Sequence, residues 1–183
     1  MEMPNEHYDL IVIGSGPAGE KGAAQAAESG KRVAIIERSA NVGGAGINGT
    51  VPSKTLREAA LYFSGLRQRG LFGIDYALKE NLSIKDFMQR QQFAVDNEQK
   101  LVEDNLQHQN ITLIHGKAVL KDAHTVHVTS NEGETQITGD VILVATGSLP
   151  YNPPEFPVGG KLVYDSVSIL QMDRIPKTLA IVG

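Results

Sequence analysis

Three glycines near the N-terminus have the spacing of a phosphate-binding turn. Gly14, Gly16 and Gly19 follow an apolar run and precede an alanine-rich stretch. In such a turn the first glycine permits a tight bend, the second lets a pyrophosphate approach the backbone, and the third lets a helix pack closely on a strand. The N-terminus of that helix also offers unpaired N–H groups to phosphates. The predicted binding residues are Gly14, Ser15, Gly16, Pro17, Ala18 and Gly19.

An acidic residue follows at the distance that a dinucleotide site needs. Glu37 ends a second apolar run, close to the expected spacing of about 20 residues beyond the glycines. Its carboxylate can accept hydrogen bonds from ribose hydroxyls and would repel a 2′-phosphate. Arg38 beside it is included in the predicted cofactor-binding set. A glycine-rich turn without a ligand is the alternative. The joint presence of strand, glycines, helix and acid disfavours it, but this pattern does not choose between FAD and NAD.

A second glycine-rich stretch, VGGAGINGTVPSK at Val42–Lys54, allows three interpretations. It could cradle a phosphate, form an ordinary surface turn, or stand where a redox group sits in other proteins. Pro52 and Ser53 suit the start of a helix. The residues that would form its apolar face are Leu56, Ala59, Ala60 and Phe63.

The glycines and the acid require a strand–helix–strand unit to position them. Tyr8–Ile13 and Arg32–Glu37 are short apolar runs rich in β-branched residues, which predicts strands buried on both faces. The alanines between them predict a helix that stops near Gly30. Because a crossover of this kind makes its two strands parallel, the sequence predicts an α/β, Rossmann-like fold with a parallel sheet and crossover helices.

Further strands are predicted in the second half of the chain. Ile111–Ile114 forms one strand, and turn signals then divide residues 117–140 into a small inserted antiparallel β-meander. Val141–Ala145 is a separate buried strand in this prediction. Proline-rich Tyr151–Gly160 is predicted to be irregular. Thr178–Gly183 repeats the pattern of the first strand, which predicts the start of a second nucleotide-binding domain and hence a truncated protein.

A long helix is also predicted, from Ser83 to about His108. Asp86 stands at the capping-box distance from Ser83. The apolar stripe of this helix consists of Ile84, Met88, Val95 and Val102.

Composition excludes several classes of function. The 183 residues carry a net charge of -4 and no basic run, which disfavours nucleic-acid binding. No stretch has the roughly 20 apolar residues that a membrane span needs, and the N-terminus has no signal-peptide pattern, so a cytoplasmic protein is expected. Cysteine is absent, which excludes disulfides, thiolate metal sites and thiol catalysis. No histidine motif predicts a metal site.

Five motifs in order resemble the pyridine nucleotide-disulfide oxidoreductase superfamily. They are GSGPAG, the GG…GTVPSK stretch, HGKAVL, ILVATGSLPY and YDSVSIL. The chain resembles the N-terminal FAD domain of that superfamily along nearly all its length. GTVPSKTLRE and the YDSVSIL region are most similar to the soluble, Si-specific NAD(P)+ transhydrogenases. The resemblance implies an FAD-binding domain at residues 1–177 and the first strand of a truncated NAD(P)-binding domain at residues 178–183.

The resemblance also assigns roles to residues. Disulfide-reducing members carry two cysteines before the PSK motif, where this chain has Thr50 and a position near Gly46, in a loop that is one residue shorter. A threonine cannot take part in thiol–disulfide exchange, so this loop would be a wall of the flavin site. Lys54 would be the catalytic residue, with its ammonium near flavin N5. The other implied cofactor contacts are Gly43, Gly44, Thr50, Lys54, Gly116, Ala118, Ala145, Thr146 and Gly147.

Three functions remain open at this point. The first is a redox flavoenzyme domain that, in the intact enzyme, takes a hydride from NADPH through FAD to NAD+. The second is a flavoprotein similar to dihydrolipoamide dehydrogenase that lacks the redox cysteines. The third is a non-catalytic FAD-binding module. The resemblance further implies NAD(P)H as substrate and a homodimer formed through a C-terminal domain that this sequence lacks, with no nucleic-acid or membrane partner.

Overall fold

The computed structural model describes residues 6–68, 83–159 and 162–182. The chain divides into two compact units, which are described separately. The first comprises Met1–Asn48 and Asn97–Ser148, and the second comprises Gly49–Asp96 and Leu149–Gly183. Gly160 and Gly183, the last residues of two predicted segments, lie outside the described residues.

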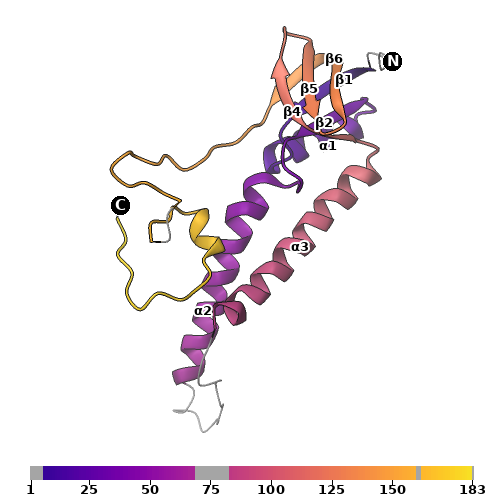
Figure 1. Ribbon diagram of the computed structural model, residues 1–183. Coiled ribbons are helices and arrows are strands. Elements are labelled where there is room, and N and C mark those ends of the chain that lie inside the picture. Colours follow the sequence, from indigo (N-terminus) through magenta and orange to yellow (C-terminus); the bar gives the residue numbers. More distant parts are fainter. Residues whose placement is uncertain (1–5, 69–82, 160–161, 183) are drawn as a thin grey trace. The chain divides into compact units, whose positions relative to one another are not determined.

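The first unit contains one six-stranded sheet in the order β3-β2-β1-β6-β5-β4. Figure 1 labels five of these strands, β1, β2, β4, β5 and β6. Strand β1 (Glu6–Ile13) pairs in parallel with β2 (Val33–Glu37) and with β6 (Gly133–Val144), and β2 pairs in parallel with β3 (Thr112–His115). Helix α1 (Pro17–Glu28) connects β1 to β2. The predicted parallel strand–helix–strand unit is therefore confirmed.

The meander is also present. Strand β4 (Lys117–Leu120) pairs antiparallel with β5 (Thr125–Ser130), which pairs antiparallel with the first half of β6. The prediction of a separate strand at residues 141–145 is wrong, because β6 runs without a break to Val144 and pairs with both β5 and β1. Gly139 permits this close passage, since a Cβ there would lie 2.9 Å from the Ile11 side chain.

Two apolar clusters fill the first unit, one on each face of the parallel strands. One cluster joins α1 and the C-terminal part of α3 (Ile84–His108) to the sheet, and the other lies between the sheet and the meander. The buried residues of the first are Val12, Ala23, Val33, Ile35, Val42, Val102, Leu106 and Ile111. Those of the second are Tyr8, Ile11, Ala34, Ile36, Val126, Val128 and Ile137. Both clusters fix the strand ends from which the predicted site residues project.

The helical region after the second glycine loop starts earlier than predicted. A π-helical turn, η1 (Gly46–Thr50), leads directly into α2 (Val51–Gln68), so Pro52 lies inside the helical run instead of starting it. A proline has no N–H to bond backwards, and π-helical turns, although rare, occur mostly as single turns within helices. The hydroxyls of Ser53 and Thr55 donate to Gly49 O and Val51 O at 2.6 Å and 2.8 Å.

Helix α3 begins and ends close to the predicted residues. The Ser83 backbone N–H and hydroxyl both donate to Asp86 Oδ2, at 2.7 Å and 2.6 Å, as the capping-box spacing predicts. In the second unit, the rings of Phe63 on α2 and Phe87 on α3 lie 4.9 Å apart between centroids. No helix of the described residues is long and apolar enough to cross a membrane.

The C-terminal region contains little regular structure among its described residues. Residues 151–159 are irregular, as predicted, and the short helix η3 (Ser168–Gln171) is the element that follows. Asp165 accepts hydrogen bonds from Ser168 N at 2.7 Å and Val167 N at 3.0 Å. These bonds, led by the one from Ser168, lower the pKa of Asp165 to about 2.

The strand predicted at residues 178–183 is not formed over 178–182, which are exposed and lack a pairing partner. A strand needs a neighbour for its backbone hydrogen bonds. The assignment of this segment to a second nucleotide-binding domain stays a prediction.

Candidate nucleotide-binding site

The first and third glycines of the fingerprint are fixed by backbone packing. Gly14 has a φ of +104°, and a Cβ on it would lie 2.4 Å from Ala145 O. A Cβ on Gly19 would lie 1.9 Å from Gly14 O. Neither space admits a side chain, so the turn between β1 and α1 takes the compact form that a dinucleotide fingerprint needs.

The second glycine has a different environment, which suits a ligand. An ideal Cβ on Gly16 would have Gly44 Cα, at 3.8 Å, as its nearest neighbour within 4 Å. Conversely, a Cβ on Gly44 would lie 2.9 Å from Gly16 Cα. The two glycine-rich loops therefore pack backbone to backbone. The sequence pattern did not reveal this contact, because the loops are about 28 residues apart in the chain.

The N-terminus of α1 has no side-chain cap. Gly16 is its N-cap residue, and Pro17 opens the helix. The first N–H groups of a helix have no partner within it, and the helix dipole places partial positive charge there. This end of α1 can therefore accept an anion.

Glu37 lies at the carboxyl end of β2 and is held by protein donors. Its Oε2 accepts hydrogen bonds from the backbone N–H of Ser15 at 3.0 Å and from the Ser15 hydroxyl at 2.7 Å. Its Oε1 accepts from the backbone N–H of Ser39 at 2.8 Å. Glu37 is 6% exposed and Ser15 is fully buried. The acid thus lies directly against the phosphate-binding turn, where a ribose next to that phosphate would be.

Ser15 also joins the two loops. Its hydroxyl and its carbonyl oxygen both accept from the backbone N–H of Gly43, at 3.1 Å and 3.2 Å. The hydrogen bonds of this one residue, which follows β1, thus reach both the end of β2 and the second glycine loop. Ser39 is a site residue that sequence reasoning missed. The only signal for it is a short polar residue two positions after the acid, which many turns share.

The hydrogen bonds to Glu37 change its acidity. Burial alone raises the pKa of this carboxyl, but the bonds from Ser15 and Ser39 stabilise the charged form and bring the pKa below its ordinary value of 4.5. A carboxyl with a lowered pKa in the folded state stabilises the fold fully above the unfolded-state value. That contribution is lost as pH falls through the folded-state value.

We expect the Glu37 contribution to the free energy of unfolding to disappear in acid. The difference between the parent and Glu37→Gln should be constant above about pH 5 and should shrink as pH falls below 4.5. Urea unfolding of both proteins between about pH 7 and pH 3 measures it. The other carboxyls that titrate in this range contribute equally to both proteins, so their effect on the free energy of unfolding cancels in the difference. A difference that stays constant down to the lowest pH would contradict the assignment.

Other predicted contacts lie at the carboxyl ends of the parallel strands. The backbone N–H of Gly116 donates to Glu37 O at 2.9 Å, and that of Ala145 donates to Ile13 O at 2.9 Å. Gly147 has a φ of +67°. These positions follow β3 and β6, and ligands of open α/β sheets bind at this edge. Ala118 lies on β4 against the apolar cluster below the meander, and Thr146 is exposed. Arg38, also exposed, directly follows Glu37.

Two predicted site residues belong to the second unit. Thr50 ends the π-helical turn η1, and Lys54 lies in the first turn of α2. Both residues are exposed. Their roles at a flavin stay predictions, whereas Gly43 and Gly44 of the same loop belong to the first unit with the fingerprint.

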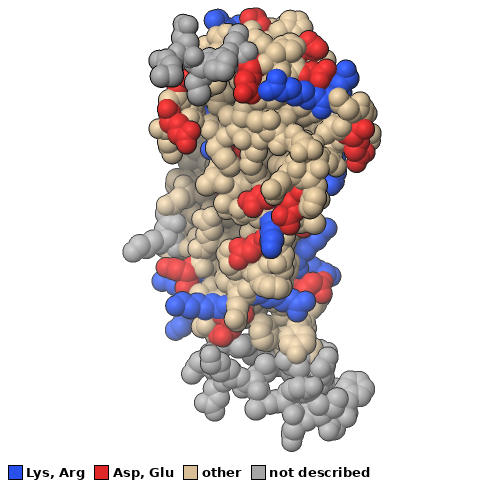
Figure 2. All heavy atoms as spheres, turned by 90° about the vertical axis from the view of Figure 1, so that its right-hand side faces the viewer, with Lys and Arg blue, Asp and Glu red and all other residues tan. Residues whose placement is uncertain are grey.

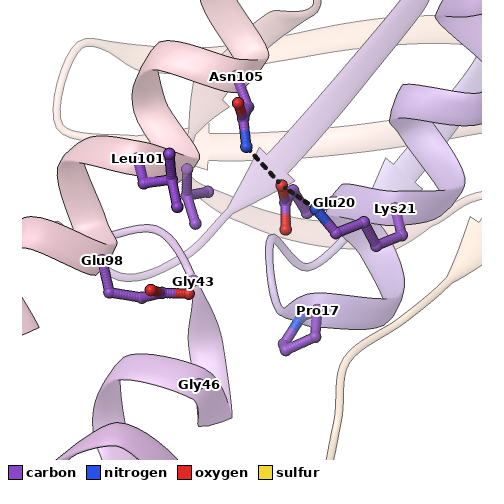
Figure 3. A pocket seen from close by; sticks show the side chains of 9 residues that line it. Pro17, Glu20, Lys21, Gly43, Gly46, Glu98, Leu101 and Asn105 are labelled. Atoms are coloured by element: carbon purple, nitrogen blue, oxygen red, sulfur yellow. Dashed lines mark hydrogen bonds and ion pairs between the residues drawn. The ribbon is translucent and has the colours of Figure 1, made fainter.

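A small hollow lies beside the N-terminus of α1 (Figure 3). Its volume is about 150 Å³, smaller than the roughly 300–1,000 Å³ of most small-molecule sites. Glu20 points into it and accepts hydrogen bonds from Asn105 Nδ2 at 3.2 Å and from Lys21 Nζ at 2.9 Å. The bond from Asn105 ties α1 to α3, and the hollow is therefore a packing feature beside the turn.

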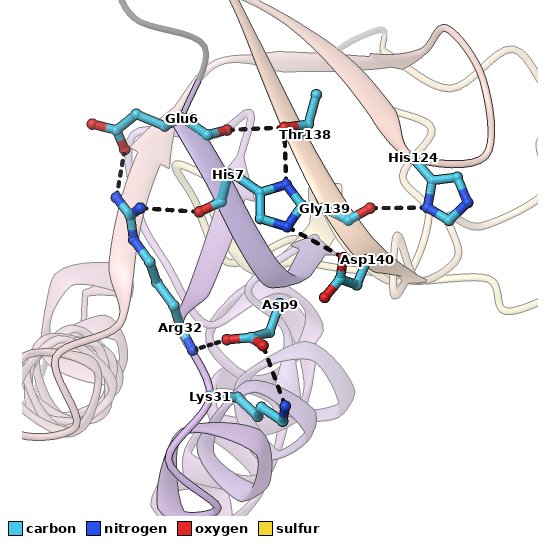
Figure 4. Close-up of polar contacts among 9 residues, drawn as sticks. All are labelled: Glu6, His7, Asp9, Lys31, Arg32, His124, Thr138, Gly139 and Asp140. Atoms are coloured by element: carbon cyan, nitrogen blue, oxygen red, sulfur yellow. Dashed lines mark hydrogen bonds and ion pairs between the residues drawn. The ribbon is translucent and has the colours of Figure 1, made fainter.

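Further polar contacts join neighbouring strands near the amino ends of β1 and β2, away from the candidate site (Figure 4). Asp9 accepts from the backbone N–H of Arg32 at 2.7 Å, which joins β1 to the start of β2. His7 lies 3.2 Å from Asp140, which joins β1 to β6. Within the described residues, no group of three His, Cys, Asp or Glu side chains is placed to hold a metal ion.

The sequence profile described as Pyridine nucleotide-disulphide oxidoreductase matches residues 8–183. The chain belongs to this family. That membership agrees with the glycine turn and the acid at the end of β2, and it confirms the resemblance found in the sequence.

Relatives within the pyridine nucleotide-disulphide oxidoreductase family carry a more specific name. A soluble pyridine nucleotide transhydrogenase of Mycobacterium bovis is 40% identical over 179 residues, which are 96% of this chain and 38% of that protein. One from Vibrio cholerae is 37% identical over 183 residues, which are 97% of this chain and 38% of that protein. The chain therefore spans about two fifths of the length of these curated relatives.

A solved structure of the family has a similar fold. The Cu(II) complex of the HOCl-induced flavoprotein disulfide reductase RclA from Escherichia coli superposes with a TM-score of 0.74 at 31% identity. The match covers 93% of this chain and 36% of RclA. The α/β fold with a parallel sheet, a crossover helix and an antiparallel meander is confirmed.

Proposed function

We propose that this chain is the FAD-binding part of a flavin-dependent oxidoreductase. In the whole protein, the proposed activity is that of a soluble pyridine nucleotide transhydrogenase, which passes a hydride from NADPH to NAD+. The observation that carries the proposal is the contact between Glu37 and the Ser15 N–H and hydroxyl in the fingerprint turn. It brings the ribose-binding acid and the phosphate-binding turn together in one site.

The residues of the turn fit the pyrophosphate of FAD. The space beside Gly16 is open, because the nearest neighbour of an added Cβ would be Gly44 Cα. The N-terminus of α1 has no side-chain cap. Ala18 and Gly19 would direct their N–H groups to the phosphates, and Glu37 would accept from the ribose. Bound FAD supplies the ability to accept and return a hydride, which no side chain of this protein can do.

Disulfide reduction is not part of the proposed activity. That chemistry needs a pair of thiols beside the flavin, and the chain has no cysteine. Thr50 stands where disulfide-reducing members of the family have their second cysteine. This difference favours direct exchange between two pyridine nucleotides over a relay through sulfur.

The charges on one face of the molecule bear on the kind of partner that we propose. On the face shown in Figure 2, basic and acidic side chains are interspersed. A nucleic-acid site would need a continuous basic patch. We further propose NADPH and NAD+ as substrates, a homodimer for the intact enzyme, and the cytoplasm as its location.

The first test is reconstitution with FAD. After incubation and gel filtration, we expect a yellow protein that releases FAD, identified by mass spectrometry. FAD should be retained in preference to NAD, because the second glycine loop extends the site beyond the adenosine half. Release of NAD alone, or a colourless protein, would overturn the proposed function.

The second test concerns the acid at the end of β2. Glu37→Gln keeps the size of the side chain and one acceptor oxygen, whereas Glu37→Ala would also leave the donors of Ser15 and Ser39 unpaired. We expect Glu37→Gln to weaken FAD binding by about 1–3 kcal/mol, as for the loss of a charged acceptor. Glu134→Gln, at an exposed position on β6, is the matched control. Equal FAD affinity in Glu37→Gln and the parent would show that another residue binds the ribose.

A further inference from the structure

The hydroxyl of Ser15 belongs to the phosphate-binding turn, but its polar partners are protein groups. Ser15 is fully buried. Its Oγ donates to Glu37 Oε2 at 2.7 Å and accepts from the backbone N–H of Gly43 at 3.1 Å. A hydroxyl has a single proton, and the carboxylate already accepts it. The side chain therefore has no donor left for a phosphate or a ribose, although the sequence predicts Ser15 as a cofactor contact.

The direction of both hydrogen bonds is fixed by the groups that make them. A backbone N–H can only donate, and an ionised carboxylate can only accept. The chain of bonds therefore runs from the Gly43 N–H to the Ser15 hydroxyl and from that hydroxyl to the Glu37 carboxylate. Hydrogen bonds in such a chain polarise one another, so a negative charge at its end strengthens both bonds. Through Ser15, the charge of Glu37 thus acts on the second glycine loop.

Other bonds keep the turn in place without this hydroxyl. The backbone N–H of Ser15 also donates to Glu37 Oε2, at 3.0 Å, and the Ser15 carbonyl oxygen also accepts from the Gly43 N–H, at 3.2 Å. The two loops pack backbone to backbone at Gly16 and Gly44. Removal of the hydroxyl should therefore preserve the fold and weaken the link between the acid and the loop.

We propose that Ser15 is a positioning residue, whose hydroxyl transmits the charge of Glu37 to the second glycine loop and holds the carboxylate ready for a ribose. Its part in ligand binding rests on the proposed function, whereas the link itself exists without a ligand. One charge then fixes both the ribose-binding acid and the loop that packs on Gly16. A dinucleotide would meet groups that are already positioned, which lowers the cost of ordering them on binding.

Hydrogen exchange at the Gly43 amide of the ligand-free chain tests the link. Ser15→Ala removes the acceptor Oγ, so we expect the Gly43 N–H to exchange about 2- to 12-fold faster, the range for one hydrogen bond. NMR of the isotope-labelled protein measures each amide. The Gly14 N–H, which donates to Ile36 O at 2.9 Å, is the internal reference and should keep its rate. Ser29→Ala, which removes an exposed hydroxyl at the end of α1, is the matched control and should change neither amide.

A second variant tests whether the charge of the acid matters. Glu37→Gln keeps an acceptor oxygen but removes the charge, so the Gly43 amide should again exchange faster while the Gly14 amide does not. In the double variant with Ser15→Ala, the chain of bonds is already broken, so the Gly43 rate should not exceed that of the faster single variant. Independent effects would multiply instead, and that result would overturn the inference.

FAD binding tests the other half of the role. Without the hydroxyl, binding must order the Glu37 carboxylate, which we expect to weaken FAD binding about 2- to 12-fold, the range for immobilising one side chain. Burial raises the pKa of Glu37, and the bond from the Ser15 hydroxyl is the main influence that brings it below the ordinary value of 4.5. In Ser15→Ala this pKa should rise, so FAD affinity should fall at a higher pH than in the parent. Calorimetric titrations between about pH 7 and pH 4 measure both effects.

The comparison isolates Glu37 from other ionisable groups. On the elements next to it these are Arg38, Glu20 on α1, His115 on β3 and Lys117 on β4, and the second glycine loop from Val42 to Thr50 has none. Each is present in the parent and in Ser15→Ala alike. Their contributions to the pH dependence, and the titration of FAD itself, therefore cancel in the difference.

The results separate the inference from the proposed function. If Ser15→Ala leaves the Gly43 exchange rate unchanged, or accelerates Gly14 and Gly43 equally, the link is absent and the inference fails even though FAD binds. An identical pH dependence of FAD affinity in parent and variant would also overturn it. If the parent does not bind FAD, the proposed function fails, and the exchange rates of the ligand-free chain still decide whether Ser15 links the acid to the loop.

Discussion

Replacing Gly19 by alanine should lower the free energy of unfolding by about 3 kcal/mol, the upper part of the range for overpacking. An ideal Cβ at this position lies 1.9 Å from Gly14 O and 3.2 Å from Val12 Cγ1. The first of these contacts is with the backbone, which has no rotamer through which it could move away. Urea unfolding followed by circular dichroism measures the effect.

The turn that surrounds Gly19 has little freedom to relax. The N–H of Gly14 donates to Ile36 O at 2.9 Å, which fixes the turn to β2. On its other side, Gly14 packs against the backbone of Ala145, which is itself bonded to Ile13 O at 2.9 Å. Moving Gly14 O away from an added methyl group would therefore disturb β1, β2 and the end of β6 together.

Gly22→Ala in the same helix is the matched control. Its added Cβ would lie 2.7 Å from Leu143 Cδ2, the far end of a side chain that can rotate, and alanine favours a helix over glycine by about 1 kcal/mol. We expect this variant to stay within about 1 kcal/mol of the parent. Failure of Gly19→Ala to fold while Gly22→Ala folds would agree with the prediction, and equal stability of the two variants would contradict it.

Local patterns in the sequence were sufficient to predict the centre of the fold. The predicted strands Tyr8–Ile13 and Arg32–Glu37 are mostly apolar and β-branched, and they lie in the centre of the sheet, where Tyr8, Ile11, Val12 and Val33–Glu37 are buried. The Ser83 cap and the helical period gave α3 to within a residue of its start. These elements were predictable because the signals lie within one helix or strand.

The errors arose where neighbours distant in the sequence decide the structure. Val141–Val144 continues β6 because the strand exchanges its partner β5 for β1 while its backbone stays extended. No local turn signal marks that exchange. Likewise, the helical run begins before Pro52, with the π-helical turn Gly46–Thr50, which no local signal in the sequence marks.

The same limit applies to the candidate site. The sequence predicted Glu37 and the glycine turn, because their spacing along the chain is characteristic. It did not predict that Ser15 would bond both Glu37 and Gly43, or that Ser39 would lie between the acid and His115. Hydrogen bonds of this kind depend on which side chains turn inward at strand ends, and spacing carries no information about that.

Replacing Lys54 by methionine should slow flavin reduction by NADPH about 10²- to 10³-fold, the range for losing one preorganised electrostatic group. When the flavin accepts a hydride, negative charge would grow on its ring, and a fixed ammonium beside N5 would stabilise that charge. Such an interaction would be stronger in a site that excludes water, because the dielectric constant there is lower. Stopped-flow spectroscopy of a protein that also carries a pyridine-nucleotide-binding domain measures the rate.

The fold should tolerate this change. Lys54 is exposed in the first turn of α2, and no ion pair involves it within the described part of the chain. The side-chain hydrogen bonds at the start of the helix come instead from the hydroxyls of Ser53 and Thr55, which donate to backbone carbonyl oxygens. Because methionine has a similar length and favours helices, stability should change by less than about 0.5 kcal/mol. A slower reaction in Lys54→Met would therefore reflect lost charge and not lost structure.

Two further variants separate a catalytic charge from a general one. Lys54→Arg keeps the positive charge and should retain most of the rate, whereas Arg57→Met removes an exposed cation one turn further along α2 and should leave the rate unchanged. Arg57 lies 3.0 Å from Glu58, so its charge is already paired. If Lys54→Met reduces flavin within about twofold of the parent, the ammonium is only a solvated charge on the helix surface. If Arg57→Met slows the reaction equally, the effect belongs to the net charge of α2, and Lys54 has no special place at the flavin.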